Sequence, residues 1–176
     1  MPVIFGKRVA LGPILPLDMP EFFRWLDDAE LARLNEPYYP KNWHRQEAFW
    51  TNADGDKSRI FFAIRAQGDA IAIGYVQITN IDPVHRSADI GICIGDATQR
   101  RQGRGREALE LAIAYCWNTL NLSRVALSVF ATNQPAIALY TALGFASEGV
   151  LRRAKYINGQ WVDVVLMALL RAISQQ

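Results

Sequence analysis

The chain has 176 residues, of which 51% are hydrophobic and 20% charged, with a formal net charge of +2. This balance is ordinary for a globular protein and too mildly basic to indicate nucleic-acid binding from bulk charge. No apolar run approaches the roughly 20 residues that span a bilayer, which excludes a membrane-spanning helix. The segment 1–12 lacks the apolar core of a signal peptide, so we expect no targeting segment and a cytoplasmic location.

Cysteine and histidine are too few and too scattered for a metal centre. Cys93 and Cys116 belong to no C-x-x-C pattern, and His44 and His85 form no H-E-x-x-H motif. We therefore expect neither a disulfide framework nor a bound metal.

The first half of the chain predicts helices followed by an antiparallel pair of strands. After an extended start at 9–18, Asp18 and Glu21 form a D-x-x-E capping box that predicts a helix. The remaining predicted elements of this half are helical segments at 21–28, 29–35 and 43–52, a loop between Pro37 and Pro40, and two strands within 58–79 around the turn 67–69.

The second half alternates strands and helices. Apolar residues spaced for one face make 106–120 the clearest helix, and Asn158-Gly159 predicts a type I′ hairpin turn. The other predicted elements are strands at 87–96 and 124–131, a helix at 135–143 ended by Gly144, and two strands within 148–170. This order predicts one domain of the α/β (α+β) class, a mixed sheet with helices on both faces.

The stretch QRRQGRGREA, residues 99–108, has three interpretations. Charge runs are usually solvated, and arginine clusters also bind nucleic-acid backbones. Here, however, Gly103 and Gly105 come directly before the clearest helix. Glycines let backbone N–H groups approach an anion, and the helix start and the arginines favour negative charge. The third interpretation, a phosphate site, is the one we favour.

The stretch matches neither common nucleotide motif. It lacks the Gly-Lys-Ser/Thr ending of a P-loop. It fits the loose dinucleotide pattern G-x-G-x-x-A, but 96–102 separates it from the preceding strand and the next strand ends without an acid.

Three blocks in this order resemble the GNAT N-acetyltransferases. Residues 100–105 match the segment of that family that binds the pyrophosphate of acetyl-CoA, and 132–145 match its N-x-x-A-I-x-L-Y-x-x-x-G-F block. Residues 148–170 resemble the ending of its ribosomal-protein N-terminal and spermidine acetyltransferase branch. The resemblance implies a largely antiparallel sheet of about seven strands. It also divides the chain into an acceptor-side half, 1–85, and an acetyl-CoA-binding core, 86–170.

The resemblance implies which residues bind the cosubstrate acetyl-CoA. The backbone of one strand would bind the pantetheine arm, with an N–H near Ile94 available to an oxyanion. Asn133 aligns with a cofactor-contacting asparagine but is equally placed to cap the helix at Pro135. Cys93 lies in an apolar strand and is not expected to act as a nucleophile, because this family transfers directly. The expected cofactor residues are Ile92, Cys93, Ile94, Arg100, Arg101, Gln102, Gly103, Arg104, Gly105 and Asn133.

Two residues are expected to serve catalysis. Tyr140 aligns with the tyrosine that protonates the CoA thiolate in many GNAT enzymes, and an ordinary phenol holds its proton at pH 7. Its alternative role is a core aromatic. Asp89 takes the place of a glutamate found in many relatives and is a candidate base or ammonium anchor. Its alternative role is an exposed carboxylate at a strand end.

The acceptor site is expected in the first half of the chain. Glu36, Tyr38 and Tyr39 lie in the proline-bracketed loop, and an acid with aromatics suits a cationic amine. Trp25 and Trp50 are expected to pack the helices. Expected partners are a small-molecule amine or a protein N-terminus, without nucleic acid or membrane, and an exposed edge strand makes a homodimer plausible.

Two other functions stay open at this point. One is a CoA-binding regulatory module without catalysis, and the other is a nucleic-acid-binding protein that uses the arginine cluster. Tyr140 and the complete 100–105 segment favour the acetyltransferase over both.

Overall fold

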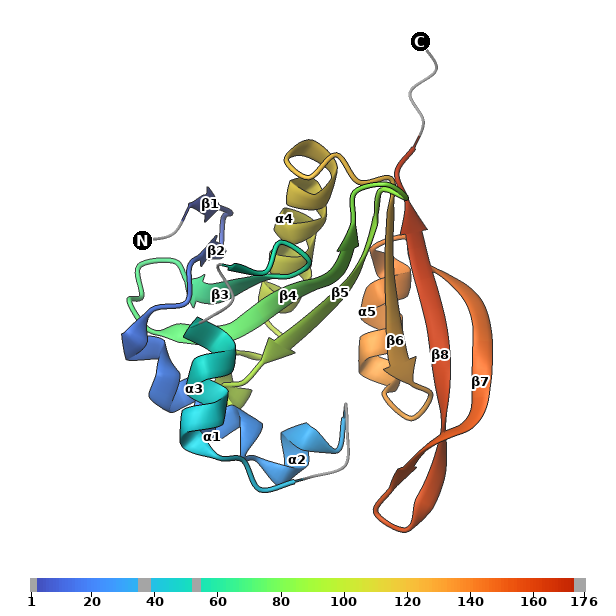
Figure 1. Ribbon diagram of the computed structural model, residues 1–176, viewed down its shortest axis with the longest axis horizontal. Helices are drawn as coiled ribbons and strands as arrows, with labels where there is room; N and C mark the ends of the chain where they lie inside the picture. The colour runs from blue at the N-terminus through green and yellow to red at the C-terminus, as the bar shows by residue number, and fades with distance from the viewer. Residues whose placement is uncertain (1–2, 35–38, 52–54, 173–176) are drawn as a thin grey trace.

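The computed structural model describes residues 3–34, 39–51 and 55–172. One eight-stranded sheet runs through this part of the chain in the order β1-β2-β3-β4-β5-β6-β8-β7 (Figure 1). Its strands are β1 (Ile4–Phe5), β2 (Val9–Gly12), β3 (Ile60–Ala66), β4 (Ala72–Asp82), β5 (Ser87–Ile94), β6 (Arg124–Phe130), β7 (Ala146–Ile157) and β8 (Gln160–Leu170). The sheet has one strand more than the seven expected, because the two-residue β1 pairs with β2.

Helices cover both faces of the sheet, as the sequence predicts. In β3, Phe62 and Ile64 belong to the core cluster that α4 and α5 share, whereas Phe61 and Ala63 belong to the cluster beneath α1 and α3. This alternation follows from the two-residue period of a strand. The helices are α1 (Met19–Leu26), α2 (Ala29–Ala32), α3 (Trp43–Thr51), α4 (Arg104–Asn118) and α5 (Gln134–Ala142), with 3-10 turns at Pro16–Asp18 and Ala97–Gln99.

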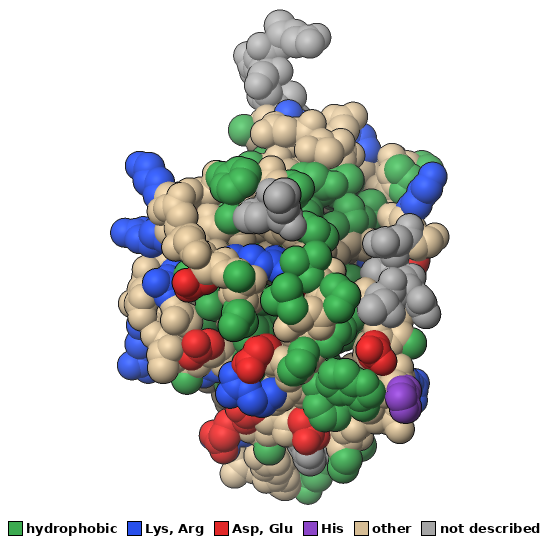
Figure 2. Space-filling view, turned by 90° about the vertical axis from the view of Figure 1, so that its left-hand side faces the viewer, with side chains coloured by type: hydrophobic (Ala, Val, Ile, Leu, Met, Phe, Trp, Pro, Cys, Tyr) green, Lys and Arg blue, Asp and Glu red, His purple; other side chains and the backbone are tan. Residues whose placement is uncertain are grey.

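The side of the molecule that carries α1 and α3 exposes several large hydrophobic side chains among charged ones (Figure 2). Trp43 and Phe49 of α3 are 36% and 40% exposed. None of the described helices is long and apolar enough to cross a membrane.

Neighbouring strands are antiparallel except for β5 and β6. These two pair in parallel at only three positions, the last of which joins Asp89 to Ala126. Beyond that pair β5 continues along β4 and β6 continues along β8, so the two strands part (Figure 1).

The C-terminal hairpin confirms its sequence signal. Asn158 and Gly159 both have positive φ, +48° and +82°, as a type I′ turn requires. Tyr156 and Trp161 face each other beside this turn, with ring centroids 5.2 Å apart.

The predicted capping box at Asp18 is wrong. The Asp18 carboxylate makes no cap bond to α1. It is fully buried and accepts hydrogen bonds from the Leu15 N–H at 2.8 Å and from Arg65 of β3 at 2.5 Å. Arg65 also donates to the carbonyls of Ala70 and Pro13. The pair therefore ties the start of α1 to β3 and to the β3–β4 turn.

Breaking this pair should destabilise the protein strongly. We expect Asp18→Asn to lower the free energy of unfolding by about 3 kcal/mol, because it leaves the buried Arg65 guanidinium without its counter-charge. Glu21→Gln is the matched control, since its partner Arg24 lies on the surface, and should cost less than about 1 kcal/mol. Urea unfolding measures both, and an equal small loss for the two variants would contradict this role of Asp18.

Candidate active site

A cavity of about 1020 Å³ lies where β5 and β6 part. Its wall joins β4, β5 and β6 to α1, α3, α5 and the C-terminal hairpin. Of the side chains predicted to form the site, it brings together Tyr140, Asp89, Ile92, Cys93 and Tyr39. Residues from both the acceptor-side half and the expected cofactor core thus share one cavity.

The parting leaves backbone groups of β5 facing the gap. The Gly95 N–H donates to the Ile73 carbonyl of β4 at 3.0 Å. Because N–H directions alternate along a strand, the N–H groups of Ile92 and Ile94 point away from β4 and toward β6. The ladder to β6 has already ended at Asp89. An extended ligand with amide groups fits here as a replacement for the missing strand.

Tyr140 lies on α5 and reaches the cavity from the core. Its side chain is 7% exposed, and its ring packs against Phe145 with centroids 5.7 Å apart. Burial raises the pKa of the Tyr140 phenol to about 12, so this group keeps its proton throughout the neutral range. Tyr140 is thus a core aromatic that also lines the cavity, and its role in catalysis stays a prediction.

Asp89 is half-buried at the last position where β5 pairs with β6. Its Oδ2 accepts a hydrogen bond of 2.8 Å from Nδ2 of Asn80, which lies in β4. The carboxylate therefore occupies the closed end of the strand gap with a fixed orientation. That position suits a group that meets the reacting amine.

The Cys93 thiol is poorly suited to nucleophilic attack. Burial raises its pKa to about 11, so almost none of it is thiolate at pH 7. Cys93 thus contributes wall surface to the cavity, in line with the expectation that it is not a nucleophile.

Gly103 opens α4 with a backbone that favours glycine. It is the residue before the first helical turn and has φ +76°, while Arg101 also has a positive φ of +59°. A Cβ on Gly105 would lie 3.5 Å from Ile94 Cγ1, which shows how closely the start of α4 approaches β5. The first backbone N–H groups of this 15-residue helix have no intrahelical partner, as an anion site requires.

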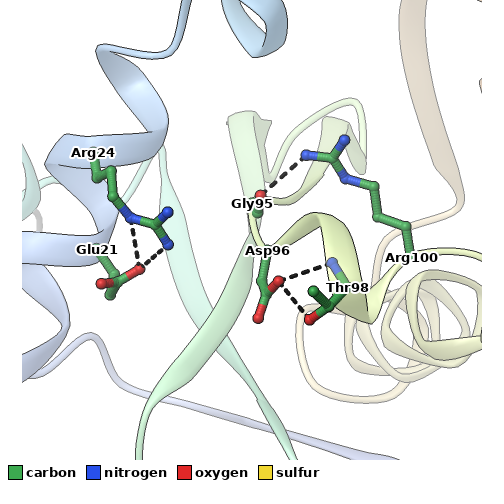
Figure 3. Close-up of polar contacts among 6 residues, drawn as sticks. All are labelled: Glu21, Arg24, Gly95, Asp96, Thr98 and Arg100. Carbon is green, nitrogen blue, oxygen red and sulfur yellow. Dashed lines mark hydrogen bonds and ion pairs between the residues drawn. The ribbon is translucent and has the colours of Figure 1, made fainter.

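The side chains of the arginine cluster have different surroundings. Arg100 folds back onto the end of β5, where its Nε donates to the carbonyl of Ile94 at 2.8 Å. Its guanidinium also donates to the carbonyl of Gly95 at 3.0 Å (Figure 3). Arg106 forms an exposed ion pair with Glu110. The cluster is therefore not a uniform solvated patch, and Arg100 fixes the loop to β5.

Two other predicted cofactor side chains serve the local fold. Gln102 donates to the Thr98 carbonyl at 2.6 Å, and Asn133 caps α5 by accepting a hydrogen bond of 3.3 Å from the Ala136 N–H. The capping alternative for Asn133 is thus present in the structure. None of the positions 100–105, nor Ile94 or Asn133, lines the cavity itself.

Of the three predicted acceptor residues, the structure describes Tyr39. Glu36 and Tyr38 lie outside the described residues, while Tyr39 lines the cavity and is 63% exposed. Within the described ranges, no group of three or more histidine, cysteine, aspartate or glutamate side chains is arranged to hold a metal.

The cavity wall contains an ion pair that the sequence does not predict. Arg124 of β6 donates to both carboxylate oxygens of Glu148 in β7, at 2.7 and 2.5 Å. This pairing lowers the pKa of Glu148. No motif marks the pair, because its two residues meet only through the order of β6, β8 and β7.

Comparison with known proteins agrees with this geometry. The family model described as acetyltransferase (GNAT) domain matches residues 8–146. The spermidine N(1)-acetyltransferase of Escherichia coli is 34% identical over 65% of this chain, but the match spans only 60% of that protein. The L-amino acid N-acetyltransferase AaaT of Escherichia coli is 32% identical over 71% of this chain and 77% of that protein.

A solved structure extends the likeness to nearly the whole chain. The spermidine N-acetyltransferase from Vibrio cholerae, in complex with CoA and spermine, superposes with a TM-score of 0.85 at 26% identity. The match covers 94% of this chain and 96% of that one. The same Vibrio protein has also been solved as a dodecamer, with a TM-score of 0.78 at 25% identity over 94% of this chain and 95% of that one. The parted strands, the glycine-opened α4 and the family match lead to one conclusion: this chain belongs to the GNAT acetyltransferase family.

Proposed function

We propose that the protein transfers the acetyl group of acetyl-CoA directly to a primary amine. The single observation that carries the proposal is the gap between β5 and β6, with Tyr140 and Asp89 in the same cavity. Membership of the GNAT family supports the chemistry. The amine nitrogen bonds to the thioester carbonyl carbon, the carbon–sulfur bond breaks, and the nitrogen loses a proton. CoA leaves as the thiolate, which takes a proton from the solvent.

The cofactor fits the residues of the second half. Acetyl-CoA supplies the activated acetyl thioester. Backbone groups of Ile92, Cys93 and Ile94 would hold its pantetheine arm, and the N–H groups at the start of α4 would hold its pyrophosphate. The anion-binding segment is 100–105, within which Arg100 acts by positioning the loop. Asn133 keeps a proposed cofactor contact beside its capping bond.

Tyr140 would stabilise the leaving sulfur. A phenol of pKa about 12 is too weak an acid to transfer its proton fully to a thiolate whose parent thiol has a pKa near 8.5. It is, however, always protonated and donates a hydrogen bond to the sulfur as negative charge develops.

Asp89 would hold the amine and receive its proton, directly or through water. A lysine-like amine with a pKa near 10.4 is neutral in only about one molecule in a few thousand at pH 7, which costs roughly 4–5 kcal/mol. An α-amino group with a pKa near 8 costs only about 1 kcal/mol and needs less help.

The partners complete the proposal. The acceptor is a small-molecule amine or a protein N-terminus, with Glu36, Tyr38 and Tyr39 as acceptor-side residues and without nucleic acid, metal or membrane. The dodecameric Vibrio relative supports a homo-oligomer, of which a homodimer is the simplest case. A cytoplasmic location and a single domain with halves 1–85 and 86–170 belong to the same proposal.

Removing the phenol should lower turnover. We expect Tyr140→Phe to lower kcat by roughly 10²- to 10³-fold, as other transition-state donors do, with acetyl-CoA affinity within about twofold. CoA release, measured with a thiol reagent on a panel of amines, reports kcat, and calorimetry reports affinity.

Tyr115→Phe is the matched control, because Tyr115 packs on Phe62 outside the cavity and should keep full activity. Unchanged turnover in Tyr140→Phe would remove this phenol from the mechanism. If the protein binds acetyl-CoA but acetylates none of the amines, the alternative function, a CoA-binding module without catalysis, would be supported instead.

Neutralising Asp89 should lower the rate of acetyl transfer. We expect Asp89→Asn to lower kcat/KM by roughly 10²- to 10⁴-fold, as the loss of a general base does, because no carboxylate remains to receive the proton of the amine; CoA release measures it. Glu148→Gln is the comparison, since Arg124 occupies both oxygens of Glu148. An Asp89→Asn variant with unaltered kcat/KM would contradict the base role.

A further inference from the structure

A glutamine in the cavity wall lies across a glycine of the strand that would bind the cofactor. Gln77 of β4 pairs with Gly91 of β5, and both line the cavity. A Cβ on Gly91 would come within 2.8 Å of Nε2, 3.1 Å of Cγ and 3.3 Å of Cδ of Gln77. These three nearest atoms all belong to one side chain, so the glycine provides the space that Gln77 occupies. A glycine inside a strand often marks such a close approach.

Gln77 is on the same face of the sheet as Asp89. Side chains alternate along a strand, so the register of β4 and β5 places Gln77, Asp89 and Gly91 on one face. Ile78 and Ile90, which alternate with them, belong to the core cluster on the other face. The carboxamide of Gln77 and the carboxylate of Asp89 therefore border the same cavity.

The two side chains are diagonal neighbours in the β4–β5 ladder. Asp89 comes two residues before Gly91, a distance of about 7 Å along an extended strand. Long side chains reach each other across such a diagonal. One amine nitrogen that donates two hydrogen bonds of about 2.9 Å joins oxygens roughly 5 Å apart, so both side chains can bind the same nitrogen.

Each of the two side chains has an oxygen available for that nitrogen. Asn80 donates to Oδ2 of Asp89 at 2.8 Å, and no other described residue hydrogen-bonds to this carboxylate. Gln77 is half-buried, and its carboxamide makes no hydrogen bond within the described part of the chain. A carboxamide has an oxygen acceptor beside its N–H donors, so Oε1 of Gln77 and Oδ1 of Asp89 are both free to accept.

Gln77 also lies on the side from which an acceptor would enter. Tyr75, two residues earlier in β4, packs in the cluster beneath α1 and α3, so Gln77 is on the face that these helices cover. Gly91 precedes Ile92, whose N–H faces the strand gap. An amine that comes from the N-terminal helices therefore meets a thioester in the gap on the face that carries Gln77 and Asp89.

We propose that Gln77 binds the reacting amine together with Asp89. This inference rests on the proposed acetyl transfer. A neutral primary amine has two N–H groups and one lone pair, and the lone pair must point at the thioester carbon for attack. Oε1 of Gln77 accepts one N–H and Oδ1 of Asp89 accepts the other, which aims the lone pair. Gln77 thus favours primary over N-methylated amines, and Gly91 makes room for it.

Removing the carboxamide should reduce this preference. Gln77→Met keeps the length of the side chain and loses both the oxygen and the N–H groups. The probes are cadaverine with N,N′-dimethylcadaverine and glycine amide with sarcosine amide. We expect kcat/KM for the primary amine to fall roughly three- to tenfold, as the loss of one hydrogen bond does. The N-methylated amine has a single N–H for Asp89 and should lose less, so the ratio of the two kcat/KM values should fall at least about threefold.

Two further measurements separate this contact from a general defect. Acetyl-CoA affinity, measured by calorimetry, should stay within about twofold in Gln77→Met. Gln67→Met is the matched control, because Gln67 is exposed in the β3–β4 turn outside the cavity wall. It should leave both kcat/KM and the ratio unchanged.

Gly91→Ala tests the space that the glycine provides. The added Cβ meets the flexible Gln77 side chain and no backbone among its nearest atoms, so the variant should keep its melting temperature. It should nevertheless lower the ratio as Gln77→Met does, because the carboxamide is displaced. In a Gln77→Ala background the space is empty, and Gly91→Ala should then cause no further loss.

Opposite results would overturn the inference. Unaltered ratios in Gln77→Met and Gly91→Ala would refute it while leaving acetyl transfer intact. A further loss from Gly91→Ala in the Gln77→Ala background would also contradict it, because the methyl group would then obstruct the acceptor directly. Acetyl-CoA binding without acetylation of any primary amine would instead refute the proposed function and this inference together.

Discussion

The early end of pairing between β5 and β6 is the constraint on which the site depends. Three residue pairs hold these strands together, and each then follows a different neighbour. A sheet that parts in this way leaves backbone donors and acceptors unpaired at its centre, which a folded protein tolerates only where a ligand or water takes them. The same parting brings residues of α5, β7 and the N-terminal helices around one cavity. The site is thus a gap in the hydrogen-bond ladder of the sheet.

Two contacts hold the N-terminal helices against the sheet beside this gap. The buried pair of Asp18 and Arg65 fixes the start of α1 to β3. At the other end of α1, the ring of Trp25 lies on Gly95, directly after β5. In the proposed site, the same strands that would bind the cofactor therefore also position the N-terminal helices.

Local signals in the sequence predicted most of the helices and strands of the second half of the chain. They predicted few of the side-chain contacts of the first half. The glycines at 103 and 105, Pro135 and the Asn158-Gly159 turn act through their own backbone, so the elements they begin or end could be recognised from residue type alone. The prediction that Asp18 caps α1 was wrong because Arg65, 47 positions further along the chain, binds its carboxylate instead. The arginines of 100–106 were grouped by their charge, yet the carbonyls of β5 and the neighbouring Glu110 engage two of them.

Only the three-dimensional structure shows the pairing of Arg124 with Glu148, and the indoles of Trp25 and Trp50, whose Nε1 atoms have no hydrogen-bond partner among the described residues. Each depends on strand order or on what is missing around a buried group, and neither leaves a periodic pattern in the sequence.

Amide hydrogen exchange, followed by NMR with and without saturating acetyl-CoA, tests the central claim most directly. The N–H groups of Ile92 and Ile94 face the gap and should exchange much more slowly once the cofactor completes the ladder, as should those at the start of α4. The N–H of Cys93 already faces β4 and should change little. Acetyl-CoA binding that leaves the exchange of Ile92 and Ile94 unaltered would contradict the account, because the gap between β5 and β6 would then not be the cofactor site.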